Sequence, residues 1–72
     1  MPPTFTGHAL DRLRQRGISR EDVESALNRR TGRTLAGELG SIWVFGYDRS
    51  GAILKVCVAT DDHTRVITAA RP

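Results

Sequence analysis

The hydrophobic residues near the start of the chain recur with the period of an α-helix. Between Gly7 and Arg16 they form one stripe, which consists of Ala9, Leu10 and Leu13. Thr6 precedes this segment as a possible N-cap, and Gly17 is the residue type that most readily ends a helix in the left-handed conformation. The pattern therefore predicts a helix from about Gly7 to Arg16.

A second helix is predicted directly after Ile18. Ser19 can cap it, and Glu21 and Asp22 suit the positive end of the helix dipole in its first turn. Near Arg29–Arg30 the helical pattern fades, after an apolar stripe made of Val23, Ala26 and Leu27. Ile18 lies between the two helices and is expected to anchor this helix hairpin in the core.

After Gly32 the pattern changes to that of strands separated by polar turns. The three clearest strands are Ile42–Phe45, Ile53–Ala59 and Arg65–Ala69, and a short strand at Thr34–Ala36 would precede them. The turns are expected at Tyr47–Gly51 and at Thr60–Thr64. The second of the three strands is the longest apolar run, so we expect it at the centre of the sheet.

Helices followed by a run of strands are typical of an α+β fold. We expect a single domain over residues 1–72, in which an N-terminal helix hairpin packs on a three- to four-stranded antiparallel meander sheet. Met1–Thr4, with two prolines, is expected to form only an extended lead-in. A chain of this length buries about 60% of its unfolded surface, so its core is small.

The composition excludes several classes of protein. Hydrophobic residues make up 39% of the chain and charged residues 26%, which is too apolar for a disordered tail. No segment approaches the roughly 20 apolar residues of a membrane span, and no charged-then-apolar leader opens the sequence. Cys57 is the only cysteine, which rules out an internal disulfide and a four-cysteine zinc site, and we expect an inert buried thiol there. We therefore expect a soluble domain that needs no metal, cofactor or membrane.

The excess positive charge lies in the first half of the chain. Residues 1–33 carry seven arginines and four acidic residues, a net charge of +3, whereas residues 34–72 carry four basic and four acidic residues. A basic surface of this kind attracts polyanions, RNA or DNA first among them. Ten of the eleven basic residues are arginine, the side chain best shaped to bind phosphate, although a GC-rich genome would produce the same bias.

His8, Arg12 and Arg16 are spaced four residues apart, so they lie along one stripe of the first helix. Histidine exchanges protons near neutral pH, and arginine can stabilise a phosphate whose charge grows during transfer. These groups suffice for cutting RNA by attack of its own 2′-hydroxyl without a metal. Arg12 lies about 6 Å along the axis from His8 and can share its phosphate, whereas Arg16, about 12 Å away, would hold the next phosphate or support the fold. The same spacing is also typical of an ordinary solvent-facing helix surface.

Further candidates lie on the predicted strands. Trp43, Phe45 and Tyr47 alternate and should share one face, where they could stack bases, although we expect the first two in the core and Tyr47 in solvent. Lys55 could present its amine to RNA or merely extend to solvent from a strand. His63 could be a second proton-transfer group or, with the neighbouring aspartates, a metal ligand, but a solvated turn residue is favoured.

Thr68 stands in the last predicted strand. Simple alternation places Val66, Thr68 and Ala70 on one face, so its hydroxyl would lie among apolar neighbours. Threonine is also common in edge strands for its β-propensity alone.

The segment from Thr4 to Leu27 closely resembles the opening of a family of small bacterial domains. These occur as C-terminal toxin modules of contact-dependent inhibition and other polymorphic toxin systems, and as stand-alone proteins. The shared signature is His8-Ala9, Arg12 and Arg16-Gly17-Ile18 before a capped apolar helix, and Arg65-Val66-Ile67-Thr68 is similar to the family's closing strand. The resemblance is sharp over residues 5–27 and 65–68. It implies a barnase/EndoU/colicin/RelE-like ribonuclease fold and metal-independent cleavage of RNA, often tRNA.

The same resemblance implies roles for individual residues. His8 would be the acid/base, Arg12 the phosphate stabiliser, Arg16 a second cation, and Thr68 the donor of a hydroxyl. Family members often carry an aromatic or polar side chain after the threonine, where this chain has two alanines, so that contact is either missing or supplied by Arg71. Lys55 and Tyr47 complete the set of candidate substrate contacts.

The sequence thus predicts a metal-independent ribonuclease toxin domain that acts on RNA, with tRNA as the expected substrate. An acidic immunity or antitoxin protein is the expected partner. The domain would work in the cytoplasm, of its producer if it stands alone or of a target cell if it is delivered. The alternative is a non-catalytic RNA- or partner-binding module, such as an antitoxin or regulatory companion, in which His8 moves no proton.

Overall fold

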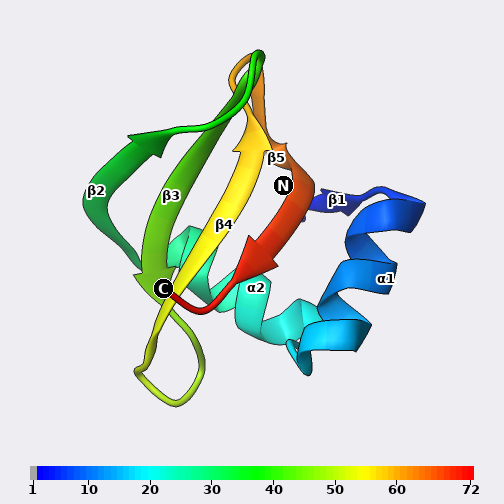
Figure 1. Cartoon of the computed structure of the whole chain (residues 1–72). Helices are drawn as coiled ribbons and strands as arrows, with labels where there is room; N and C mark the ends of the chain where they lie inside the picture. The colour runs from blue at the N-terminus through cyan, green and yellow to red at the C-terminus, as the bar shows by residue number, and fades with distance from the viewer. Residues whose placement is uncertain (1) are drawn as a thin grey trace.

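The computed structural model describes residues 2–72 and has an α+β fold of two helices and a five-stranded mixed sheet (Figure 1). In chain order the elements are β1 (Thr4–Phe5), α1 (Gly7–Arg16), α2 (Arg20–Asn28), β2 (Arg30–Ala36), β3 (Ser41–Tyr47), β4 (Ile53–Ala59) and β5 (Asp62–Ala70). Within residues 2–72 no helix is long and apolar enough to cross a membrane.

The two helices confirm the local signals of the sequence. Thr6 accepts a hydrogen bond from the backbone N–H of Ala9, and Ser19 accepts one from the N–H of Asp22, so both N-caps form as predicted. Gly17 ends α1 with a φ of 66°, in the left-handed region that glycine occupies without strain. These signals act within a few residues, which is why the sequence alone determines where the helices begin and end.

The sheet differs from the predicted three- to four-stranded antiparallel meander. Its strand order is β1-β5-β4-β3-β2, and β1 pairs in parallel with β5 through Thr4–Arg65 and Phe5–Val66. Thr4, the last residue of the predicted extended lead-in, is therefore part of a strand. A strand of two residues is too short to be recognised from an alternation of polar and apolar positions. On the opposite edge, β2 spans seven residues from Arg30, not only the predicted Thr34–Ala36. The prediction that Ile53–Ala59 forms the central strand is confirmed.

Both helices lie on the same side of the sheet, with α2 behind β3 and β4 and α1 beside β5 (Figure 1). Their apolar sides and the sheet residues that face them form one core, which comprises Ala9, Leu13, Ile18, Val23, Ala26, Val44, Leu54, Val56, Val58, Val66 and Ala69. Gly46 of β3 lies so close to α2 that a Cβ built on it would collide with the backbone of Ala26. The other side of the sheet carries no helix, and we call it the open face.

A bulge in β5 decides which side chains reach the open face. Val58 pairs with Val66, but the next residue of β4, Cys57, pairs with Thr68, so β5 has one extra residue at this point. Directly paired residues share a face, so Thr68 lies with Cys57 on the open face while Val66 points into the core. The expectation that Val66 and Thr68 share a face is therefore wrong. The predicted turn at Thr60–Thr64 is also shorter, because β5 already begins at Asp62.

Candidate active site

A hollow of about 500 Å³, the His8 cavity, lies where α1 meets the open face of the sheet. Side chains from four strands or turns and one helix line it: His8, Arg12, Glu38, Leu39, Ser41, Trp43, Cys57, Ile67 and Thr68. The structure thus brings together the three residues predicted to be catalytic, which lie near opposite ends of the chain. His8 and Arg12 are exposed on α1, and Thr68 is half-buried on β5.

The helical spacing explains one half of this arrangement and the bulge explains the other. His8 and Arg12 are one turn apart, so both follow the side of α1 that borders the open face. Thr68 reaches the same cavity only because the bulge turns it away from the core. Without that extra residue its hydroxyl would point toward the helices.

Arg16 does not line the cavity, but its guanidinium forms hydrogen bonds with Thr68 and the next residue of β5. Its Nη1 donates to Thr68 Oγ1 at 3.1 Å and to the carbonyl oxygen of Ala69 at 2.7 Å. The parallel strand β1 pairs β5 only at Arg65 and Val66, so this guanidinium occupies the edge of β5 beyond the last paired residue. Because a guanidinium can only donate, the Thr68 oxygen acts as acceptor and its hydroxyl proton stays free to point into the cavity. These two hydrogen bonds fit the second of the roles predicted for Arg16, support of the fold.

The remaining predicted substrate contacts do not line the His8 cavity. Lys55 lies with its Nζ 4.7 Å from the centre of the Trp43 ring, at the border of the cavity. Tyr47 is exposed, as predicted, but at the far end of β3. Phe45 is buried, yet on the open face beneath Arg33, whose Cζ is 4.7 Å from the ring centre, and not in the core below the helices.

Arg71 is bound to Asp48, at 2.5 Å between Nη1 and Oδ2. Asp48 is almost completely buried and also accepts hydrogen bonds from Ser50 and from the backbone N–H of Ala52. The Ser50 hydroxyl and then the Arg71 guanidinium are the main causes that hold the pKa of Asp48 well below its usual range, against the opposing effect of burial. Arg71 therefore does not line the His8 cavity, because its guanidinium closes this turn.

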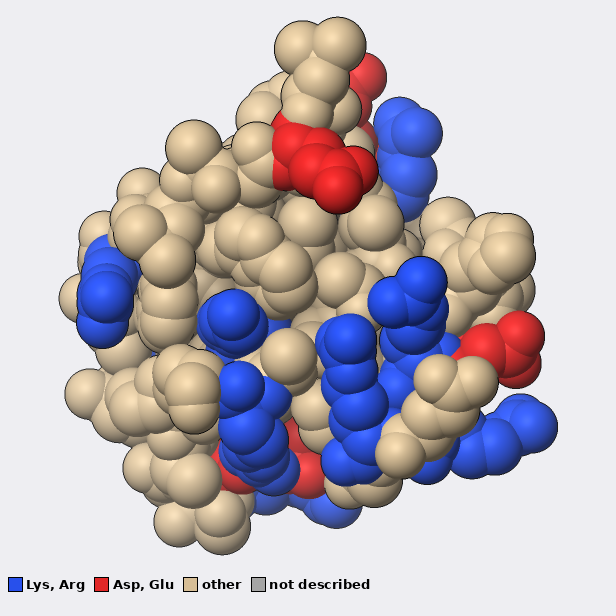
Figure 2. Space-filling view, in the orientation of Figure 1, with Lys and Arg blue, Asp and Glu red and all other residues tan. Residues whose placement is uncertain are grey.

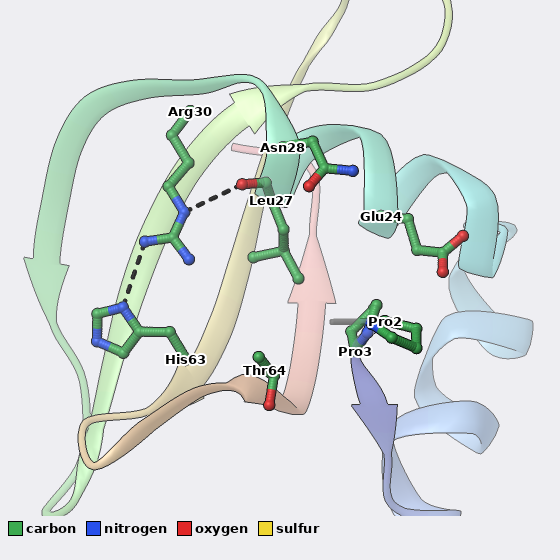
Figure 3. Close-up of a pocket in the computed structure, with 8 residues that line it drawn as sticks. All are labelled: Pro2, Pro3, Glu24, Leu27, Asn28, Arg30, His63 and Thr64. Atoms are coloured by element: carbon green, nitrogen blue, oxygen red, sulfur yellow. Dashed lines mark hydrogen bonds between the residues drawn. The ribbon is translucent and has the colours of Figure 1, made fainter.

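His63 lies outside the His8 cavity, in a second hollow of about 380 Å³ (Figure 3). That hollow is lined by Pro2, Pro3, Glu24, Leu27, Asn28, Arg30, His63 and Thr64. Arg30 connects its parts, with Nη1 at 3.2 Å from His63 Nδ1 and Nε donating to the carbonyl oxygen of Leu27 at 3.2 Å. In the described part of the chain, no three His, Cys, Asp or Glu side chains gather as metal ligands would.

Several residues of the cavity were missed by sequence reasoning. Glu38 and Leu39 belong to the turn between β2 and β3, where Leu39 is fully exposed, and Ser41 is the first residue of β3. A leucine inside a glycine-bounded turn is the signal that could have marked this segment, because an apolar side chain there cannot reach a core. Cys57 is buried as predicted, but it faces the cavity and contributes to its floor.

A scan against protein families matches residues 5–71 to the family described as "Domain of unknown function (DUF4258)". Neither a search of curated proteins nor a search of solved structures found a match to the chain.

Proposed function

The chain belongs to the DUF4258 family, and from its own residues we propose that it is a metal-independent ribonuclease of the toxin type, with tRNA as the expected substrate. The observation that supports this most directly is that His8, Arg12 and Thr68 line one cavity. An imidazole, a guanidinium and a free hydroxyl proton around one hollow are the groups that phosphoryl transfer without a metal requires.

In the proposed reaction the 2′-oxygen of RNA forms a bond to phosphorus, and the bond from phosphorus to the 5′-oxygen breaks. The products are a 2′,3′-cyclic phosphate and a 5′-hydroxyl end. One proton leaves the 2′-hydroxyl and one is added to the 5′-oxygen, and His8 is the group proposed to carry out this transfer.

Arg12 and Thr68 would act on the phosphate itself. The guanidinium of Arg12, one helical turn from His8, would pair with the non-bridging oxygens as their negative charge grows. The Thr68 proton would donate to the same oxygens, because Arg16 already occupies a lone pair of its oxygen. Arg16 would thus act as a positioning residue and not as a contact to the substrate.

Other parts of the proposal follow from the same reading. Two helices followed by the antiparallel strands β2 to β5 support a fold similar to the barnase/EndoU/colicin/RelE-like ribonucleases, with β1 as an addition. As a toxin module the protein would act in the cytoplasm, where a free nuclease harms its host. An acidic immunity or antitoxin protein that covers the open face would fit the net charge of +3.

The pairs of cations and aromatic rings on the open face favour a second candidate, a module that binds RNA or a partner protein without cleaving it. In that case RNA would be retained and released intact. Replacement of His8 would leave the affinity unchanged, and added salt would weaken it.

The test compares the cleavage of total tRNA in EDTA by the wild-type protein and by two alanine variants. His8→Ala removes the imidazole from the cavity, and His63→Ala is the matched control, because it removes the only other histidine from a separate hollow. We expect the wild type and His63→Ala to produce fragments that end in a 2′,3′-cyclic phosphate, and His8→Ala to be at least about 100-fold slower. Loss of cleavage in EDTA, or equal cleavage by His8→Ala, would overturn the proposal.

A further inference from the structure

The open face carries three aromatic side chains along β3, each beside a cation. Trp43 lies under Lys55 with 4.7 Å from Nζ to the ring centre, and Phe45 lies under Arg33 with 4.7 Å from Cζ. The third pair places the Cζ of Arg29 at 5.8 Å from the centre of the Tyr47 ring. Cations and rings therefore form one continuous row on this strand, which we call the β3 row.

The register of the sheet places the β3 row on the open face. Trp43 pairs with Cys57 and Phe45 with Lys55, while Gly46, between two members of the row, faces α2. The row begins at the proposed active site, because Trp43 is one of the residues that line the His8 cavity. A ligand that leaves the cavity along β3 would pass each pair in turn.

None of the three cations of the β3 row pairs with a carboxylate within residues 2–72, although Arg29 donates from Nη1 to the carbonyl oxygen of Asp48 at 3.3 Å. Every ion pair within residues 2–72 uses another arginine: Arg49 with Asp22, Arg65 with Asp61 and Arg71 with Asp48. Basic side chains gather across the lower half of the face shown in Figure 2. Positive charge without carboxylate partners, beside aromatic rings, is the combination with which proteins hold the backbone and the bases of a single strand.

The spacing of the row favours an unstacked strand over a duplex. Alternate residues of a β-strand are about 6.8 Å apart, so the three pairs repeat at that interval. Stacked bases within a duplex strand follow one another at about 3.4 Å along the axis, whereas the bases of an extended single strand can be spread to the longer step. The Trp43 and Tyr47 rings can each stack on a base, and over the buried Phe45 the flat guanidinium of Arg33 offers the stacking surface.

We propose that the β3 row is the substrate track for single-stranded RNA, running from the His8 cavity past Trp43 and Arg33 to Tyr47 and binding about three nucleotides on one side of the scissile phosphate. This inference rests on the proposed ribonuclease function for its direction, since the cavity marks the start of the track. The track itself binds RNA whether or not the cavity cleaves it.

Binding is therefore tested with an RNA analogue that cannot be cleaved. Oligouridines with 2′-O-methyl groups, 2 to 8 nucleotides long, are titrated against the protein while the fluorescence of Trp43, its only tryptophan, is recorded. We expect stacking to quench this fluorescence, and the affinity to rise up to about four nucleotides and then level off. A blunt duplex of similar length should bind at least about tenfold more weakly.

Three variants test the track residue by residue. Tyr47→Ala should weaken binding of the eight-nucleotide probe about tenfold, the usual loss for one stacking ring. Arg33→Gln and Lys55→Gln should each weaken binding several-fold and reduce the slope of log affinity against log salt by about 0.7. Arg20→Gln is the matched control, because Arg20 also lies over an aromatic ring, with 5.3 Å to the centre of Phe5, but on the opposite side of the sheet.

The outcomes separate this inference from the ribonuclease proposal. Quenching and single-strand preference in a protein that cleaves no RNA would support the track and refute only the cleavage. Cleavage of tRNA with equal affinity for duplex and single strand would refute the track alone. Track variants that bind no more weakly than Arg20→Gln would also overturn it.

Discussion

Replacing Arg16 by alanine removes two hydrogen bonds that hold the last strand against α1. One goes to the carbonyl oxygen of Ala69 at 2.7 Å, and the other to the Thr68 hydroxyl at 3.1 Å. A hydrogen bond to a charged group contributes about 1.5–3 kcal/mol, and because both bonds share one Nη1 of an exposed guanidinium, we count them as a single bond of about 2 kcal/mol. In a domain of this length each kcal/mol shifts Tm by about 4–8 °C, so we expect Arg16→Ala to lower Tm by about 8–16 °C.

Thr68→Val separates stability from activity. It removes the hydroxyl at nearly the same side-chain volume and leaves the bond between Arg16 and Ala69 in place. We expect a stability loss of about 0.5 kcal/mol or less, because the freed guanidinium position is open to water. Cleavage should nevertheless fall about 100-fold or more, the usual cost of removing one donor to a developing oxyanion.

The assay is a double-mutant cycle with thermal unfolding by circular dichroism and tRNA cleavage as its two measurements. Arg14→Ala is the control, since Arg14 is an arginine of the same helix that lies outside the cavity. The losses of cleavage caused by Arg16→Ala and Thr68→Val should not multiply in the double variant, because Thr68→Val removes the hydroxyl and Arg16→Ala removes only the group that orients it. Multiplying losses, or a Thr68→Val variant as unstable as Arg16→Ala, would refute the positioning role of Arg16.

Two further predictions concern stability. Ser50 and Arg71 hold the pKa of Asp48 below its usual range, so the stabilisation from this carboxylate is complete above the ordinary carboxyl pKa of about 4 and is lost as the pH falls below it. Between about pH 5 and 2, Tm should therefore fall more steeply for the wild type than for Asp48→Asn. Equal slopes of Tm against pH would contradict this. Gly46→Ala should cost about 3 kcal/mol in denaturant unfolding, because its Cβ meets the backbone of α2, whereas Gly7→Ala, with open space around it, should cost almost nothing.

Local signals account for the parts of the fold that were predicted correctly. Both helix caps, at Thr6 and Ser19, act on backbone groups three residues away, and the apolar run Ile53–Ala59 is long enough to define a central strand. The four-residue spacing of His8 and Arg12 likewise guarantees that they share one side of α1, since the helix geometry fixes it. None of these features depends on what the rest of the chain does.

The parts that were not predicted depend on pairing between distant segments. The two residues of β1 become a strand only because β5 lies beside them, about sixty residues later in the chain. Arg71 donates a hydrogen bond to the carboxylate of Asp48, which is 23 residues away in the sequence. Such contacts join segments that are far apart in the sequence, and no period or motif in the sequence encodes them.

For the candidate site the division is the same. The spacing of His8 and Arg12 in the sequence is enough to place an imidazole and a guanidinium one turn apart on an exposed helix. The folded sheet is needed to bring Thr68 to them, because a single extra residue in β5 turns its side chain from the core to the open face. Folding also brings Arg16, 52 residues from Thr68, into a hydrogen bond with this hydroxyl. Strand register is set by long-range packing, so one inserted residue changes a face without leaving any trace in the local pattern.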